Sequence, residues 1–289
     1  MIEQSIYEHL TGALGGSGFA QYGGKPAVFS QNAPADTDPG WAAGPQFPRL
    51  VFAVDWEHSA DRSLGGTMAV DIVCQEQGVP PDALEKLIRE LLHGWFFTDN
   101  GETIAAQWVN SNYFTEPVNK VAGVTMTFAL LGFPLMTIAP DVISRINAWT
   151  AEQFPALPVI NATELPAAWK PDEHSAAVYW RIISTTPATW IPETWQTIYQ
   201  TTVLRAHIFA ATIADVTVWA QQIIVALYGA KRLKQEHAAP ILVNTNNTID
   251  PSADALRTGQ VTVDATYGII VQRQSDNMLR HIHVDNSEV

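Results

Sequence analysis

Four segments of the chain place apolar residues three or four positions apart, which is the spacing of one face of an α-helix. The pattern therefore predicts four amphipathic helices. They cover residues 2–14, 84–92, 142–149 and 216–227.

The boundaries of two of these helices carry recognisable signals. Asp82 is the expected N-cap of the second helix, with Glu85 completing a capping box, and Asp215 is the expected N-cap of the fourth. Gly94 and Gly229 follow the last apolar residues of the same two helices and are expected to end them.

Other segments are strand-like, being rich in β-branched and apolar residues and in part alternating with polar ones. With the helices they predict an α+β fold, in which helices pack on one face of a largely antiparallel sheet. The expected strands cover residues 26–30, 50–57, 67–74, 104–113, 121–131, 178–184, 201–210 and 261–269.

The order of elements is repeated once. Residues 120–133 and 257–269 both place a glycine shortly before Val-Thr-apolar and end on a glycine beside an apolar residue. Val261 follows Val124 by 137 positions, and Gly229 follows Gly94 by 135. A period this long predicts two similar domains, 1–137 and 138–289, each a mostly antiparallel sheet with two helices. Two unrelated α+β domains remain the alternative.

The charge balance argues against nucleic-acid binding. The 289 residues include 29 acidic and 16 basic side chains, a net charge of −13. Residues 1–137 hold 15 acidic and 6 basic residues, a net −9, and residues 138–289 hold 14 and 10, a net −4. Phosphate backbones are bound through clustered Lys and Arg, which the sequence does not concentrate anywhere.

Sequence motifs for catalysis are not found, and the chain is predicted not to be an enzyme and to hold no cofactor. Gly15–Phe19 lacks the closing glycine of a nucleophile elbow and the lysine of a phosphate loop. Cys74, the single cysteine, ends an apolar strand and is expected to be structural.

The sequence contains one candidate metal site and one candidate membrane span, and neither is the favoured interpretation. His281, His283 and Asp285 alternate on one side of an extended segment, but a solvated tail is the favoured interpretation, so no metal is predicted. Residues 121–140 carry no charge, yet Thr125, Gly132 and other polar or helix-breaking residues favour a strand over a membrane span. The acidic N-terminal segment is unlike a signal peptide, so we expect assembly in the cytoplasm of the producing cell.

Ten tryptophans are many for this length, and tryptophan is enriched in cores and interfaces alike. Trp41, Trp190 and Trp195 lie in loops rich in Pro, Gly or Thr. They are the candidate interface residues, with local core packing as the alternative for each.

A resemblance to a known family rests on several cues in the first half. The first helix carries the pattern formed by Ile2, Glu3, Ile6, Tyr7 and Leu10. Phe-Pro-Arg-Leu-Val-Phe enters a strand at 47–52, and Asp-Arg-Ser at 61–63 precedes the strand 67–74. In this order of elements, residues 1 to about 136 resemble the tail terminator, or tail completion, proteins of long-tailed bacteriophages. The second half is similar only through the repeat.

The resemblance implies a structural protein of the virion. Such proteins form a homo-hexameric ring that caps the tail tube at its head-proximal end and docks to the neck or connector. A duplicated chain departs from the usual single domain, so six chains are expected, with a trimer as the alternative. The second domain would then contact the sheath, the collar or the neck. DNA would pass through an acidic lumen without specific binding, and no membrane is involved.

Two other functions remain open at this stage. Another tail or baseplate component of similar fold would share the same elements. An enzyme is the less favoured alternative.

Overall fold

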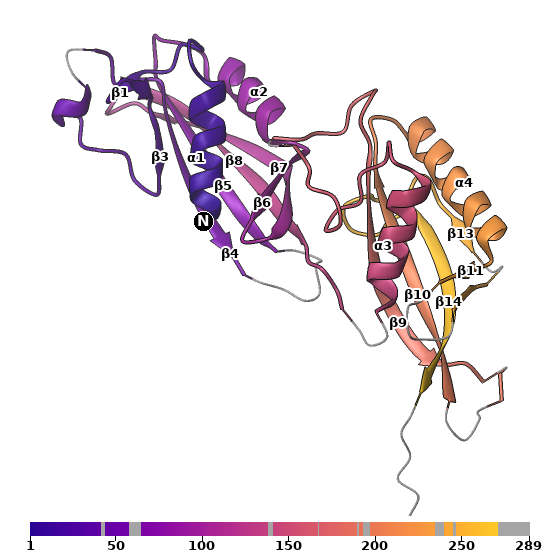
Figure 1. The fold of residues 1–289 in the computed structure, drawn as a ribbon. Helices are drawn as coiled ribbons and strands as arrows, with labels where there is room; N and C mark the ends of the chain where they lie inside the picture. Colours follow the sequence, from indigo (N-terminus) through magenta and orange to yellow (C-terminus); the bar gives the residue numbers. More distant parts are fainter. Residues whose placement is uncertain are drawn as a thin grey trace, which may run out of the picture.

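The computed structural model describes residues 1–41, 44–57, 65–137, 141–166, 168–189, 191–192, 197–234, 240–244 and 247–270. Within these residues the fold is α+β, with four α-helices packed against two six-stranded sheets (Figure 1). The helices are α1 (Ile2–Ala13), α2 (Pro81–Leu92), α3 (Val142–Gln153) and α4 (Ile213–Ala230), with one short 3₁₀ turn, η1 (Pro39–Trp41).

The first sheet has the strand order β3-β4-β5-β8-β7-β6. Its neighbours are antiparallel except for β3 and β4, which are parallel. A separate two-stranded ribbon, β1 (Gln21–Tyr22) with β2 (Lys25–Pro26), precedes it. The six strands are β3 (Val28–Ser30), β4 (Arg49–Trp56), β5 (Gly66–Gln75), β6 (Trp95–Asp99), β7 (Glu102–Glu116) and β8 (Val121–Phe133).

The second sheet has the order β11-β12-β14-β10-β9, and β13 also pairs with β14. All of its pairs are antiparallel. Its strands are β9 (Ala177–Pro187), β10 (Thr197–Phe209), β11 (Arg232–Leu233), β12 (Ile241–Val243), β13 (Thr248–Ile249) and β14 (Val261–Ile270).

Each sheet buries one face under its two helices. In β5, Met68, Val70, Ile72 and Cys74 alternate with polar or exposed positions, and all four are fully buried. They join α1 and α2 in one apolar core, while a second core gathers α3, α4 and the inner face of the second sheet. Each fully buried Leu or Ile side chain contributes roughly 1.5–3 kcal/mol to such a core.

Two predicted helix starts are wrong by a few residues. Asp82 is not the N-cap of α2, because Pro80 occupies that position without a side-chain cap and Pro81 begins the helix. For α4 the cap is Thr212, whose hydroxyl oxygen accepts from the backbone N–H of Asp215. Asp215 is the third residue of the helix, and its carboxylate accepts from the Thr212 hydroxyl.

The two glycines expected to end helices differ in role. Gly94 follows the last turn of α2 with φ +73°, a left-handed conformation that glycine tolerates. Gly229 is helical, α4 ends at Ala230, and Lys231 takes the left-handed position with φ 54°. The match between Gly94 and Gly229 therefore does not extend to their backbone geometry.

Candidate functional site

The two halves meet in a buried cluster of aromatic rings. Phe96 and Phe133 from the first half contact Phe209 from β10, with ring centroids 4.9 and 5.4 Å from that ring. Trp169 and Tyr179 pack edge-on against Phe96 and Phe133 respectively. All five side chains are buried, so the cluster fixes how the halves sit against each other.

Polar contacts surround this cluster and connect the same two halves. The Tyr179 hydroxyl donates to the carbonyl of Pro134 at 2.7 Å, and the Asn161 amide donates to the carbonyl of Phe133 at 2.9 Å. Lys170 donates from its ammonium group to the carbonyls of His93, at 2.8 Å, and Glu90. The junction is therefore held by directed hydrogen bonds as well as by apolar packing.

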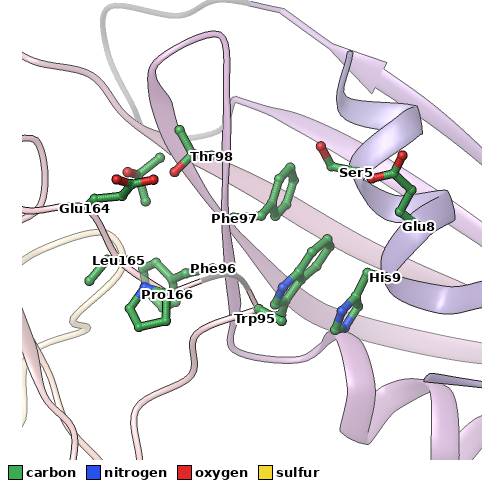
Figure 2. A pocket seen from close by; sticks show the side chains of 12 residues that line it. Ser5, Glu8, His9, Trp95, Phe96, Phe97, Thr98, Glu164, Leu165 and Pro166 are labelled. Atoms are coloured by element: carbon green, nitrogen blue, oxygen red, sulfur yellow. The ribbon is translucent and has the colours of Figure 1, made fainter. Parts of the chain in front are cut away.

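A cleft of about 340 Å³ lies at the edge of this junction (Figure 2). Helix α1 contributes Ser5, Glu8 and His9, and strand β6 contributes Trp95 to Thr98. The opposite side consists of Glu164, Leu165, Pro166 and Ala168 of the second half. In Figure 2, Glu8 and Glu164 stand on opposite sides of the aromatic residues of β6.

The most constrained polar group of the cleft is His9. Its ring stacks on Trp95, with centroids 4.1 Å apart and planes 7° from parallel. One ring nitrogen approaches the carbonyl of Leu91 at 3.4 Å. Burial lowers the pKa of His9, and the positive charge of Lys170 lowers it further. The imidazole is therefore neutral at pH 7.

Apolar rings and a few polar groups line this cleft together. Ser5 and His9 lie one helical turn apart on α1, and a hydrogen bond of the imidazole in the described part of the chain goes to the carbonyl of Leu91. The Trp95 indole N–H is buried without a hydrogen-bond partner among the described residues. Aromatic faces beside two carboxylates favour an uncharged or cationic group in the cleft.

Of the three tryptophans proposed as interface residues, only Trp41 lies within the described residues. It is 2% exposed and forms a small core with Tyr22 and Phe29. Its indole N–H donates to the carbonyl of Ala35 at 3.1 Å. Trp41 therefore packs locally, as the alternative interpretation allowed, because its ring contacts the rings of Tyr22 and Phe29. Trp190 and Trp195 lie outside the described residues.

The remaining candidate residues from the sequence are the possible metal ligands near the C-terminus and the single cysteine. His281, His283 and Asp285 lie outside the described residues, and within those residues no three potential metal ligands gather. Cys74 is fully buried in the first core, and burial raises the pKa of its thiol to about 11. Its thiol is therefore protonated at neutral pH, which suits a packing role.

The β7–β8 hairpin extends beyond its helix and forms an exposed finger, residues 109–120. Val109, Tyr113, Phe114 and Val118 are its exposed apolar side chains, and Val118 is 89% exposed. The base of the finger is fixed to α2, because the Ser111 hydroxyl donates to the Glu85 carboxylate at 2.8 Å. Sequence analysis assigned residues 104–113 to a strand, left 114–120 between two strands, and did not anticipate an exposed apolar surface here.

Helix α4 presents a second exposed surface, its outer face, on which no side chain is charged. Among the described residues, α4 is the one helix that is long and apolar enough to cross a membrane. Its inner side packs on the second sheet, as expected for a core helix. The outer face consists of Ala214, Val218, Gln221, Gln222, Val225 and Gly229.

Comparison with known proteins adds no family to this description. No protein-family model matches the chain, and no curated protein matches its sequence.

Proposed function

We propose that this protein is a virion structural protein at the head-proximal end of a bacteriophage tail. It would form a ring that terminates the tail tube and docks to the neck. The observation that carries the proposal is the architecture of residues 2–133. Apart from the small β1–β2 ribbon, a helix, three strands of the first sheet, a second helix and further antiparallel strands follow in the order on which the resemblance to tail terminators rests.

We also infer that the second half is a diverged copy of the first. In each half two long strands, β4 and β5 or β9 and β10, lie between the two helices, and further antiparallel strands follow the second helix. The sheet orders β4-β5-β8-β7-β6 and β9-β10-β14-β12-β11 correspond, although β7 is much longer than β12, and β1 to β3 and β13 have no counterpart. Val124 and Val261 both face the helices of their own half. This correspondence supports a duplication more directly than the sequence repeat does.

The surface properties are compatible with a structural role. The finger offers apolar side chains to a neighbour, and exposed apolar groups of this kind are typical of subunit contacts. The net charge of −13 would repel DNA phosphates from a central bore, so the genome could pass without being held.

The test is to locate the protein in an assembled particle. We expect electron images of intact virions to trace six copies in a ring between the tail tube and the neck. Density for the chain at the distal end would support a baseplate component instead. Three copies in a pseudo-sixfold ring would support the trimer alternative, and a neutral or basic bore would refute the acidic lumen.

A further inference from the structure

The described residues leave two apolar surfaces without a partner, the finger and the outer face of α4. We propose that they bind each other between copies of the chain, so that the finger of one copy docks against α4 of the next. This inference rests on the proposed ring function for its closure, but the contact itself follows from the two surfaces.

The two surfaces cannot meet within one chain. The end of β8 lies at the junction, where the Phe133 carbonyl accepts from Asn161, whereas its start at Val121 adjoins the finger. Twelve steps along a strand span about 40 Å at roughly 3.3 Å per residue. Figure 1 shows α4 on the far side of the second half, away from the first sheet. The surfaces thus lie toward opposite ends of the molecule.

One surface includes a groove and the other a projecting turn. Beside the outer face of α4 lies an open apolar groove of about 370 Å³, lined by Phe154, Gln221, Gln222, Val225 and Ala226. The finger ends in a turn that carries Val118, with Tyr113 and Phe114 on the strand just before it. One aromatic ring of the finger and its neighbouring valine would fill this groove. The two glutamines could then pair with backbone groups of the turn.

The flanking charges are complementary. Asp82 and Glu85 lie beside Tyr113, and their charges, after burial, raise the pKa of its phenol, while the positive charge of Arg89 opposes them in part. The outer face of α4 is followed by the exposed side chains of Lys231, Arg232 and Lys234, a short basic cluster that the interpretation of the sequence missed. Acidic groups around the finger would therefore face basic groups around the groove, which favours this pairing over the contact of two identical surfaces.

A contact from one surface to a different one is heterologous, and such contacts close into rings when the rotation between copies allows it. The outer face of α4 is about 24 Å long and about 10 Å wide, well below the roughly 800 Å² per partner of a stable pair. A single contact would therefore be weak. Closure gives every copy two such contacts, so we expect assembly to rise steeply with protein concentration.

The test uses two single-cysteine additions to the full chain, Val118→Cys and Val225→Cys, joined by a flexible bismaleimide. The native Cys74 is buried and should not react. We expect cross-linked dimers when the two variants are mixed and none when either is treated alone. Val118→Cys linking to itself would show a finger-to-finger contact, Val225→Cys linking to itself a helix-to-helix contact, and either result would overturn the proposal.

Controls separate this inference from the proposed function. Leu135→Cys, at an exposed site away from both surfaces, should not link to Val225→Cys. Val118→Asp and Val225→Asp should each raise the concentration needed for assembly at least tenfold, while Leu135→Asp should not. A ring at the tail end without the mixed cross-link would refute the contact alone. The mixed cross-link in a protein located elsewhere would refute the tail-end function alone.

Discussion

At the residue scale, Trp41 and His9 show how a side chain's surroundings decide its role. Both are aromatic residues that a sequence alone cannot place inside or outside a core. Trp41 is enclosed by the rings of Tyr22 and Phe29, whereas His9 covers Trp95 at the edge of the cleft. Their locations lead to different expectations for substitution.

Replacing Trp41 should reduce stability without affecting assembly. We expect Trp41→Ala to lower the free energy of unfolding by about 3 kcal/mol, because it leaves a large cavity in a small cluster. Trp41→Phe keeps most of the packing and loses the hydrogen bond to Ala35, so its cost should be about 1 kcal/mol. Urea unfolding measures both values. If Trp41→Phe no longer assembles in native mass spectrometry, Trp41 contributes to an interface between subunits.

Protonation of His9 should destabilise the fold. Burial lowers the pKa of His9 in the folded chain, so on acidification the unfolded chain takes up the proton first, below its own pKa of about 6.5. Stability should therefore fall as the pH drops below about 6.5. In urea unfolding at pH 7.5 and 5.5, His9→Gln should lose less stability than the native protein. His174→Gln changes an exposed histidine and is the matched control. An unchanged pH dependence in His9→Gln would contradict this account.

At the scale of elements, the helix caps and short strands show what sequence patterns resolve. Long amphipathic segments and long strands were predicted, because their periodicity covers many residues. Strands β1, β2, β6 and β11 to β13 were missed, since two to five residues next to a helix or loop give no readable period. The sequence pattern placed the cap of α4 at Asp215 instead of Thr212, because both residues have side chains that can cap a helix.

The corrected cap of α4 can be tested directly. Thr212→Ala removes the acceptor for the N–H of Asp215 and should lower the free energy of unfolding by about 1 kcal/mol. Thr217→Ala is the matched control, because the Thr217 hydroxyl donates within the helix to the carbonyl of Ile213 and caps nothing. Its effect should be near zero, since alanine is the better helix former. Equal losses in the two variants, by urea unfolding, would count against the assigned cap.

At the scale of the whole molecule, the junction makes the two halves one body. The sequence could not reveal it, because the cluster combines Phe96, Phe133, Trp169, Tyr179 and Phe209 from separate elements. The cleft was missed for the same reason, since α1, β6 and residues 164–166 and 168 are far apart in the chain. The periodicity of apolar residues in the sequence indicates which side chains are buried. It does not indicate which helices and strands pack against each other.

Weakening the junction should separate the unfolding of the two halves. Phe209→Ala removes a ring that contacts both Phe96 and Phe133, and we expect a loss of about 3 kcal/mol or more. Differential scanning calorimetry should then show two unfolding transitions, one for each half. If the native protein already shows two, the difference between their midpoint temperatures should increase. Phe154→Ala removes a ring that contacts only the second half, through Trp149 and Trp219, and should lower one transition without separating them. A single cooperative unfolding transition in Phe209→Ala would indicate that the hydrogen bonds across the junction are enough to couple the unfolding of the two halves.

The position of Lys170 bears on how such a chain could evolve. Its ammonium group binds the carbonyls of Glu90 and His93, at the C-terminal end of α2, where the helix itself supplies no donors. The second half thus completes a helix that belongs to the first. Genetic recombination that exchanged first halves between related chains would retain a well-formed α2 only where the recipient kept a cation at position 170. That single side chain would restrict which parental combinations survive.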